Sequence, residues 1–389
     1  MKNTDRHNDI VYPATAPFVL VHLACVGMIW TGVSAQWLIV CVALYFTRMF
    51  AITAGNHRYF SHRAYKTSRV GQFLLAVLCQ TAAQRGVIWW ASQHRLHHKH
   101  SDTELDPHSP RHAGFWFSHI GWIFSAKSRK VDYSIVRDLT KYPELVWLNK
   151  NRYLPAIVLG TVIWFIGSWE GLFVGFILST VILYHGTFAI NSLAHVVGRR
   201  RYVTGDDSRN NWWLALLTMG EGWHNNHHHF QSSTRQGFRW WEVDMTYYIL
   251  KMLSWTGVVW DLRAPPAAVI RGERRLAGPV IERVAHQLAA SFSAQRISAQ
   301  IRDAWAHTPV LEELRERAQR ARTQAEALIA EAHLPDIPTL DELRHRAQEM
   351  FAQQSSSLDA IAERARQIIL EAVSVELLSW SLAPASSPA

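Results

Sequence analysis

Histidine is concentrated in three short motifs of this sequence. They are His57-Arg-Tyr-Phe-Ser-His62, His94-Arg-Leu-His97-His98 and His224-Asn-Asn-His227-His228. A fourth pattern, Asn191-Ser-Leu-Ala-His195, lies between the second motif and the third. Neutral imidazole is a common protein ligand for iron, zinc and copper. The four patterns together therefore predict a metal site.

Helical spacing shows how the histidines of these motifs can share metals. Residues three or four positions apart lie on the same face of a helix. His94 and His98 can therefore hold one metal while His97 turns toward a neighbouring one, and the third motif repeats this geometry. Two such motifs facing each other predict two adjacent metal sites. The first motif would complete one ligand set, and His195 would complete the other.

Polar residues near the motifs are candidates for supporting roles. Asn191, one helical turn before His195, could hold a metal-bound water. An all-nitrogen ligand set leaves the metal charge uncompensated, so carboxylates are expected to bind the outer imidazole nitrogens. The candidate acids follow the second motif or precede the third: Asp102, Glu104, Asp106 and Glu221.

The remaining histidines are interpreted as residues that do not bind the metals. Five lie beside the motifs and are expected to be supporting or surface residues: His100, His108, His112, His119 and His229. The isolated ones are interpreted as ordinary polar side chains: His7, His22, His185, His286, His307, His333 and His345.

The elements that must position the motifs are apolar segments long enough to cross a bilayer. The chain has 389 residues, of which 49% are hydrophobic and 18 are tryptophan, a residue enriched at membrane interfaces. Four spans are predicted, at about 14–31, 34–53, 154–169 and 171–196. The segment 71–90 carries polar residues and is interpreted as an interfacial helix. The fold class is therefore all-α and integral to the membrane, with four transmembrane helices.

The distribution of basic residues predicts the orientation. The turns within the two span pairs carry no Lys or Arg, whereas the other ends of the spans carry several. The positive-inside rule then places both termini and all histidine motifs in the cytoplasm. The motifs would lie in a cytoplasmic helical cap.

The composition changes after Arg263. Ala, Arg, Glu and Gln dominate there, and apolar residues recur at helical spacing. We expect a membrane domain over 1–263 and a cytoplasmic helical extension over 264–389, whose role no motif indicates.

Cysteine content and net charge exclude several classes. Cys25, Cys41 and Cys79 lie in apolar stretches without C-x-x-C pairing, which excludes a disulfide framework, a cysteine zinc site and a fused plant-type ferredoxin. The net charge is +9. Beside such apolar segments, this charge favours membrane lipids or an acidic redox protein as partners over nucleic acid.

The motifs and their flanks resemble the membrane acyl desaturases of the delta-9 type, and the bacterial branch more than the animal one. The resemblance covers roughly Pro17 to Arg263. Matching flanks include Asp106-Pro-His-Ser-Pro110, Gly220-Glu-Gly-Trp223 and Arg239-Trp-Trp-Glu-Val-Asp244. It implies a four-helix membrane fold with a cytoplasmic cap, placed in a bacterial inner membrane.

The resemblance also implies the chemistry. Two iron ions would activate O2 and remove two hydrogens from a saturated acyl chain, leaving a cis double bond at the delta-9 position. Position by position, one iron would take His57, His62, His94, His98 and His227. The other would take His97, His195, His224 and His228, with a water held by Asn191. We expect the end of the acyl tunnel between the first spans, near Tyr45 to Phe50.

The acyl carrier and the electron donor stay open. Animal members of the family carry Arg-Asp before the second motif, where this chain has Ser92-Gln93, so coenzyme A recognition is in question. Acyl-CoA, acyl-lipid and acyl-carrier-protein substrates remain possible. There is no His-Pro-Gly-Gly haem motif, so electrons would come from a separate donor such as a ferredoxin with its reductase, or cytochrome b5.

Two other readings compete with the desaturase. A related di-iron lipid hydroxylase or oxygenase would use the same metal chemistry, although the four-residue gap in the first motif favours a desaturase. A histidine-rich metal transporter would place its ligands at mid-membrane, whereas these motifs follow the ends of the spans.

Overall fold

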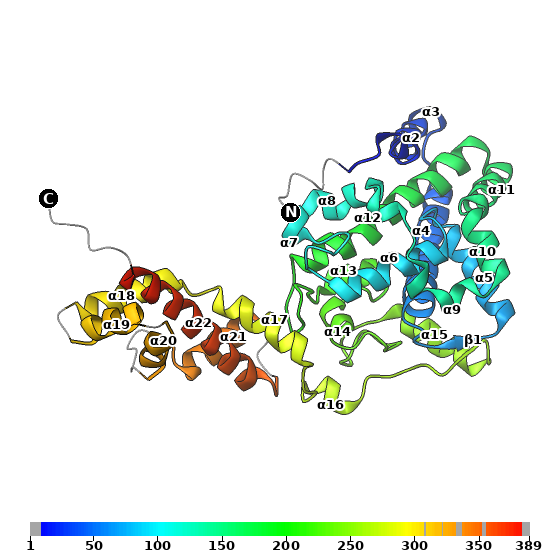
Figure 1. The fold of residues 1–389 in the computed structure, drawn as a ribbon. Helices are drawn as coiled ribbons and strands as arrows, with labels where there is room; N and C mark the ends of the chain where they lie inside the picture. The colour runs from blue at the N-terminus through cyan, green and yellow to red at the C-terminus, as the bar shows by residue number, and fades with distance from the viewer. Residues whose placement is uncertain (1–8, 307–308, 321, 332–336, 352–354, 383–389) are drawn as a thin grey trace. The chain divides into compact units, whose positions relative to one another are not determined.

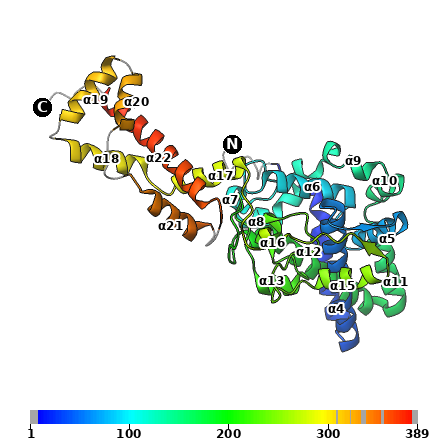
Figure 2. The same cartoon turned by 90° about the horizontal axis from the view of Figure 1, so that it is seen from below.

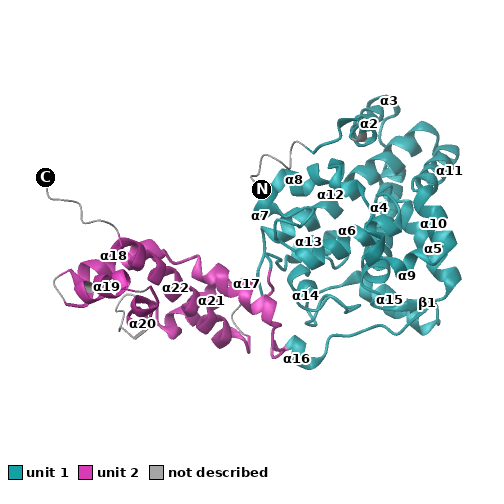
Figure 3. Ribbon diagram, viewed as in Figure 1, with its two compact units in different colours: residues 1–201, 206–270 teal, residues 202–205, 271–389 magenta. Residues whose placement is uncertain are grey.

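The computed structural model describes residues 9–306, 309–320, 322–331, 337–351 and 355–382. His7, His307 and His333 lie outside these residues. The chain divides into two compact units (Figure 3). The first unit is Met1–Arg201 with Asp206–Ile270 and holds every histidine motif, and the second unit is Tyr202–Gly205 with Arg271–Ala389.

The first apolar segment of the first unit is helical but short. It begins after η1 (Tyr12–Ala14) and runs through α2 (Ala16–Ala24), η2 (Cys25–Gly27) and α3 (Met28–Thr31). Gly32 ends it, with the positive φ of +74° that a glycine adopts without strain. The next helix, α4 (Ala35–Phe50), continues directly into the π-helix η3 (Ala51–Ser61). By length and composition, Ala35–Ser61 could cross a membrane.

A second helical run, Leu154–His195, is also long and apolar enough to cross a membrane. It comprises α11 (Leu154–Glu170), η7 (Gly171–Leu178), α12 (Ser179–Ser192) and η8 (Leu193–His195). The run bends at Ser168, whose φ of 51° and ψ of −147° are not helical. The bend falls within the predicted turn, and beyond it η7 packs against α11.

Close packing fixes this bend. A methyl group on Gly167 would come within 1.8 Å of the Trp37 indole of α4, and one on Gly160 would lie 3.0 Å from the Phe176 ring. Trp37, Ile163 and Phe176 are buried in one apolar cluster. The helices α4, α11 and α12 therefore form one bundle with η7 (Figure 1).

The predicted interfacial helix over 71–90 is two helices in the structure. α5 (Arg69–Gln80) ends before a break, and the rest of the segment belongs to α6 (Val87–His100), which carries the second histidine motif. Twelve residues of α-helix span about 18 Å, less than a bilayer core. Ala83 and Arg85 in the break have positive φ angles, which a continuous helix does not allow.

Short elements build the rest of the first unit around the bundle. The strands β1 (Lys66–Thr67) and β2 (Val259–Trp260) pair antiparallel, with Lys66 opposite Trp260. The remaining helices are α7 (Pro110–Ala113), α8 (Phe115–His119), η4 (Gly121–Phe124), η5 (Lys127–Arg129), η6 (Tyr133–Ile135), α9 (Arg137–Thr140), α10 (Pro143–Lys150), α13 (Trp212–Leu217), α14 (His224–His229), α15 (Met245–Trp255) and α16 (Ala267–Ile270).

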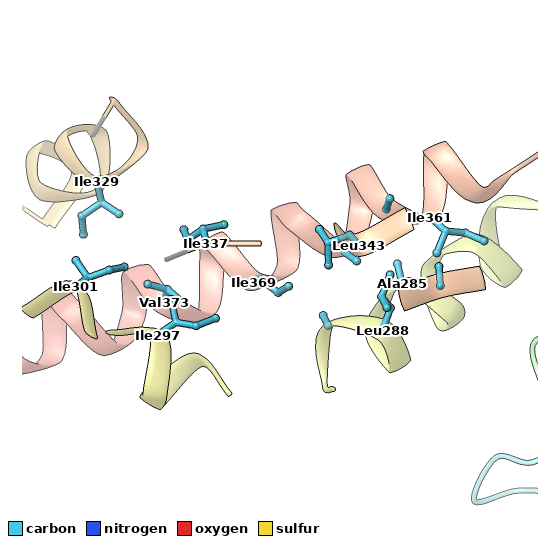
Figure 4. Packing of buried hydrophobic residues seen from close by; sticks show 14 of the residues in the cluster. Ala285, Leu288, Ile297, Ile301, Ile329, Ile337, Leu343, Ile361, Ile369 and Val373 are labelled. Atoms are coloured by element: carbon cyan, nitrogen blue, oxygen red, sulfur yellow. The ribbon is translucent and has the colours of Figure 1, made fainter. Parts of the chain in front are cut away.

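The second unit is a helical bundle with its own apolar core. Its helices are α17 (Gly278–Ala289), α18 (Ala294–Trp305), α19 (Pro309–Arg320), α20 (Arg322–Glu331), α21 (Leu340–Met350) and α22 (Leu358–Ser381). The long α22 runs beside α17, α18 and α21 (Figure 2). Buried residues such as Leu288, Ile361 and Ile369 fill the space between them (Figure 4).

The substitution Gly167→Ala tests the packing at the bend. The added methyl would overlap the Trp37 ring, and overpacking of this kind costs about 1–3 kcal/mol. We expect a lower midpoint of thermal unfolding in detergent. Gly278→Ala is the control, because the space around Gly278 is open. Equal midpoints for the two variants would contradict the role of this contact.

Candidate metal centre

The π-helix η3 brings the two histidines of the first motif together. The His62 amide donates to the His57 carbonyl at 3.1 Å, which is the five-residue hydrogen bond of a π-helix. On an α-helix, residues five apart would point about 140° away from each other. On η3 the two imidazole rings lie 4.8 Å apart between centroids. The spacing of this motif therefore depends on a local departure from α-helical geometry.

The first cluster consists of five imidazoles whose nitrogens converge. The Nε2 atoms lie 3.0 Å apart for His57 and His227, and 2.8 Å apart for His62 and His94. His98 Nε2 is 3.0 Å from His94 Nε2 and 2.9 Å from His227 Nε2. One nitrogen from each of the five rings lies within 4.8 Å of all the others. These are the five residues that the resemblance assigned to one iron.

The second cluster consists of His97, His195, His224 and His228, all buried. Their ligand nitrogens also lie within 4.8 Å of one another, and the Nε2 atoms of His195 and His224 are 3.0 Å apart. His228 Nε2 is buried, and no residue in the described part of the chain forms a hydrogen bond with it. The His98 and His228 rings lie 4.5 Å apart between centroids, so the two clusters adjoin.

Carboxylates hold the outer nitrogens of these rings. The Nδ1 atom of His195 donates to Asp102 at 2.7 Å, and that of His97 donates to Asp106 at 3.0 Å. His57 Nδ1 lies 2.5 Å from Glu221 Oε2. Three of the four candidate acids therefore contact motif histidines, whereas the Glu104 side chain is exposed.

A fourth acid, Asp206, was missed by the sequence reasoning. His228 Nδ1 donates to Asp206 Oδ2 at 2.8 Å. Asp206 lies in the loop between η8 and α13, and Ser208 holds its other oxygen through the backbone amide at 3.1 Å and the hydroxyl at 2.6 Å. The Asp-Asp-Ser sequence in the loop after the last predicted span could have indicated this additional carboxylate partner.

Electrostatic interactions lower the pKa values of two of these acids and of five of the rings. Burial opposes ionisation of Asp102, but His195 beside it outweighs burial and holds the pKa of Asp102 below its ordinary value. Burial opposes ionisation of Asp106 as well, and His97 brings its pKa down to about 2. Burial, reinforced by neighbouring imidazoles, lowers the pKa values of five rings well below the ordinary value: His62, His94, His98, His224 and His227. Neutral rings are the form that binds metals.

A buried arginine connects the first motif to the third. Arg58 donates to Glu221 at 3.0 Å, to Asp244 at 2.9 Å and to the Thr234 carbonyl at 2.7 Å. Gly220 lies against this group with a φ of +123°, and a methyl group there would come 2.4 Å from Asp244 Oδ1. The flanking Gly-Glu-Gly sequence is thus required for this close approach.

The asparagines of the third motif hold α14 in place. Asn226 donates to Glu242 Oε2 and to the Gln236 carbonyl, each at 2.9 Å. Asn225 accepts a hydrogen bond from the Arg201 amide at 2.8 Å. The two asparagines of the motif therefore hold α14 in position, while its histidines contribute imidazoles to the clusters.

Three of the other histidines beside the motifs lie next to the site but outside the two clusters. His108 is buried and stacks on His97 with ring centroids 4.3 Å apart, and burial lowers its pKa to about 3. His97, Asp106 and His108 form a third group of possible ligands. His112 donates to the Asp102 carbonyl at 3.0 Å, and His119 lies 2.9 Å from the Ser192 hydroxyl.

An apolar cavity of about 660 Å³ adjoins the clusters. His94, His108 and Asn191 line it beside the imidazoles, and Trp164 and Trp169 line it near the bend of the Leu154–His195 run. Within the described residues, the segment 45–50 that we expected at the tunnel end does not line this cavity. The walls of this cavity come from α2, the 83–85 segment, α6, η4, α11, η7 and α12.

Comparison with known proteins assigns the class of this enzyme. The fatty acid desaturase family profile matches residues 35–260, more than half of the chain. The chain belongs to the fatty acid desaturase family and is a fatty-acyl desaturase. Membership of this family implies a di-iron site, and the buried imidazole clusters are consistent with one.

Curated relatives act on acyl chains carried in different ways. The chain is 40% identical to the sn-1 stearoyl-lipid 9-desaturase of Anabaena variabilis over 59% of its own length and 85% of that protein. It is 38% identical to the acyl-CoA C20 Delta5-desaturase of Anemone leveillei, over 58% of this chain and 73% of that protein. It is 40% identical to the chloroplastic palmitoyl-monogalactosyldiacylglycerol delta-7 desaturase of Arabidopsis thaliana, over 60% of this chain and 64% of that protein.

The substitution Asp206→Asn tests the unexpected acid. A neutral amide leaves the outer nitrogen of His228 without its charged acceptor, and loss of such a partner lowers metal affinity by about 10- to 100-fold. We expect fewer iron ions per chain after dialysis against a weak chelator, measured by elemental analysis. Asp303→Asn is the control, because Asp303 is exposed in the second unit. An unchanged iron content in Asp206→Asn would refute the role of Asp206.

Proposed function

We propose that this desaturase introduces a cis double bond at the delta-9 position of a saturated acyl chain, with O2 as oxidant. The observation that carries the proposal is the pair of adjoining imidazole clusters beside an apolar cavity. The similarity to 9-desaturases supports the position of the bond. A hydroxylase would share the metal centre, and the products decide between the two.

The two clusters are the proposed iron ligands. One iron would be held by His57, His62, His94, His98 and His227. The other would be held by His97, His195, His224 and His228, with Asn191 holding a bound water. The converging imidazole nitrogens, and the buried His228 Nε2 that has no hydrogen-bond partner in the described part of the chain, fit such ions. When bound, the iron pair supplies the oxidising power that breaking unactivated C–H bonds requires.

The residues of the chain prepare and protect this chemistry. Asp102, Asp106, Asp206 and Glu221 hold the Nδ1 side of four rings, so each ring presents Nε2 to the centre of its cluster. Trp90 stacks on His94 with ring centroids 4.9 Å apart and lines the cavity beside it. This apolar wall excludes water and orients the acyl chain toward the clusters.

The overall reaction needs electrons from outside the protein. Removal of two hydrogens from the chain and reduction of O2 to two waters consume two electrons and two protons. We infer a separate donor such as a ferredoxin with its reductase, or cytochrome b5. The net charge of +9 suits an acidic donor.

The contacts of Ser92 and Gln93 favour an acyl lipid as the carrier. Both side chains are buried. Ser92 Oγ accepts a hydrogen bond from the Asp132 amide at 2.9 Å, and Gln93 donates to the Lys130 carbonyl at 2.7 Å. Because both hold the 130–132 segment, we infer that they do not bind a coenzyme A head group.

The proposed membrane arrangement has four spans, at about 14–31, 34–53, 154–169 and 171–196. The bend at Ser168 supports two crossings within the Leu154–His195 run. Exposed apolar side chains near both proposed turns, such as Trp30 at 79% and Phe165 at 75%, suit contact with lipid. We infer a bacterial inner membrane, with the site and both termini cytoplasmic, a membrane domain over 1–263 and a cytoplasmic extension over 264–389.

Expression in a host that makes only saturated fatty acids tests the function. With a donor supplied, we expect a new monoene with its double bond at a fixed position, measured by gas chromatography and mass spectrometry of derivatised lipids. His98→Ala should lose iron and product together, because it removes a proposed ligand. His286→Ala is the control, because His286 is exposed on α17. Hydroxy acids, or an unchanged lipid profile despite iron loading, would refute desaturation.

The cavity predicts how chain length is selected. Leu172 lines the cavity and precedes His195 by 23 residues along the helical run, a length of about 35 Å. Trp164 and Trp169, which lie near the bend, therefore mark the end of the cavity that is far from the imidazole clusters. We expect Trp164→Ala to shift the monoenes toward longer acyl chains, because it enlarges that end. Phe165→Ala is the control, since Phe165 is exposed and does not line the cavity. The same product lengths in both variants would contradict this role of the cavity.

A further inference from the structure

Helix α15 is apolar on two opposite faces. Its inner face buries Leu250, which packs with Ala54 and Tyr65 in one apolar cluster. Its outer face exposes four large apolar side chains: Met245 at 38%, Tyr248 at 40%, Met252 at 50% and Trp255 at 74%. Residues three and four apart share a face of a helix, so these four form one stripe. A helix that is apolar on both faces is normally buried on both, so we expect an apolar phase to cover this stripe.

The short helix α13 carries a second group of exposed apolar side chains. They are Trp212, Trp213, Leu216 and Leu217. The Thr246 amide at the start of α15 donates to the Met219 carbonyl, just after α13, at 3.0 Å. The two helices therefore adjoin, and both belong to the first unit (Figure 3). We call the exposed apolar side chains of α13 and α15 the outer apolar surface.

Both helices pack on the apolar run Ala35–Ser61. The Thr53 hydroxyl of η3 lies 2.7 Å from the Thr246 hydroxyl of α15. The Tyr45 hydroxyl of α4 donates to the Leu217 carbonyl of α13 at 2.8 Å. The outer apolar surface is therefore continuous in the fold with a helix that is long and apolar enough to cross a membrane.

The positions of these contacts along the run give the level of the two helices. Thr53 follows Ala35 by 18 residues, which is about 27 Å at the rise of an α-helix. The hydrocarbon core of a bilayer is about 30 Å thick. With Ala35 at one boundary of the core, α15 therefore meets the run close to the other boundary. Tyr45 precedes Thr53 by eight residues, so the α13 contact lies about 12 Å further into the core.

The side chains of the outer apolar surface suit that boundary. Trp and Tyr are enriched where a bilayer meets water, because their rings are apolar and carry one polar group. Neither α13 nor α15 contains an acidic residue. Lys251 is exposed within the stripe of α15, where a lysine can extend its ammonium group to lipid phosphates. This chemistry, on the flank of a membrane-crossing helix, fits lipid better than a soluble protein.

We propose that the outer apolar surface rests on the bilayer, with α15 in the interfacial layer and α13 reaching into the acyl chains. The partner is the phospholipid of the membrane that the Ala35–Ser61 run crosses. The proposal rests on the membrane arrangement of the proposed function and adds a lipid contact outside the four spans. Asp244 caps α15 and also accepts from Arg58, so the lipid contact and the polar network behind the metal centre meet at one residue.

The test places a nitroxide at single positions of the full-length chain, reconstituted at one chain per disc in nanodiscs of phosphatidylcholine and phosphatidylglycerol. The label is attached through an incorporated p-acetylphenylalanine, so the native cysteines stay in place. Power-saturation EPR compares collisions with O2, which concentrates in lipid, and with a water-soluble nickel chelate. We expect O2 collisions to dominate for labels replacing Met252 and Leu217, and to dominate more strongly at Leu217 because it lies deeper.

Two reference positions separate the possible failures. Ile39 is 70% exposed on α4 and reports lipid, and Arg137 is exposed on α9 and reports water. O2-dominated collisions at Ile39 with nickel-dominated collisions at Met252 and Leu217 would overturn the proposal and leave the membrane arrangement intact. Few collisions with either reagent at Met252 would show that protein covers the surface, which also overturns it. Nickel-dominated collisions at Ile39 as well would refute the membrane arrangement and the proposal together.

A charge within the stripe gives an independent check. Met252→Asp places a carboxylate in the proposed lipid contact, so we expect a label at Tyr248 to collide severalfold more often with the nickel chelate. Val375→Asp is the matched control, because Val375 is 52% exposed on α22 of the second unit, and it should leave the Tyr248 label unchanged. The same nickel collision rate at Tyr248 in both variants would contradict the lipid contact.

Discussion

Each proposed ligand is an imidazole with two nitrogens, and the protein uses both sides of four of the rings. Nε2 points into a cluster, while Nδ1 of His57, His97, His195 and His228 meets a carboxylate. A ring held on one side only can rotate, so the carboxylates fix the direction in which the other nitrogen points. The polar network behind the site, including buried Arg58, keeps these acids in place. Much of the first unit serves to hold four carboxylates at fixed positions.

The histidine motifs and most of their carboxylate partners could be proposed from the sequence, because these residues lie close together along the chain. Residues four apart on one helix share a face, and His94 and His98 do so in the structure. The first motif was harder, because its five-residue spacing makes sense only on a π-helix, and no residue pattern in the chain predicts that geometry. Asp206 was missed for a related reason. Its contact joins a loop to a helix 22 residues away, and spacing rules do not reach across such a gap.

The long-range features of the first unit follow from packing that the sequence does not display. The predicted turn near Gly167 was correct in place, but the contact of Gly167 with the Trp37 indole needs the fold to be known. The same holds for the cavity. Its walls combine α2, α6, η4, α11, η7 and α12, so its lining could not be listed from the first apolar segments alone. The segment 71–90 looked like one helix because its apolar residues continue across the break at Ala83 and Arg85.

The second unit is discontinuous in sequence, because it combines Tyr202–Gly205 with Arg271–Ala389. A fragment that starts at Arg271 contains every helix of that bundle but lacks Val203, so its core would have a gap where the valine belongs. Without the bundle, Val203 of the 202–205 loop would lose its buried apolar contacts. The C-terminal region is thus unlike a domain appended by simple gene fusion. Grafting it onto another desaturase would require the recipient to carry a matching loop after its last membrane helix.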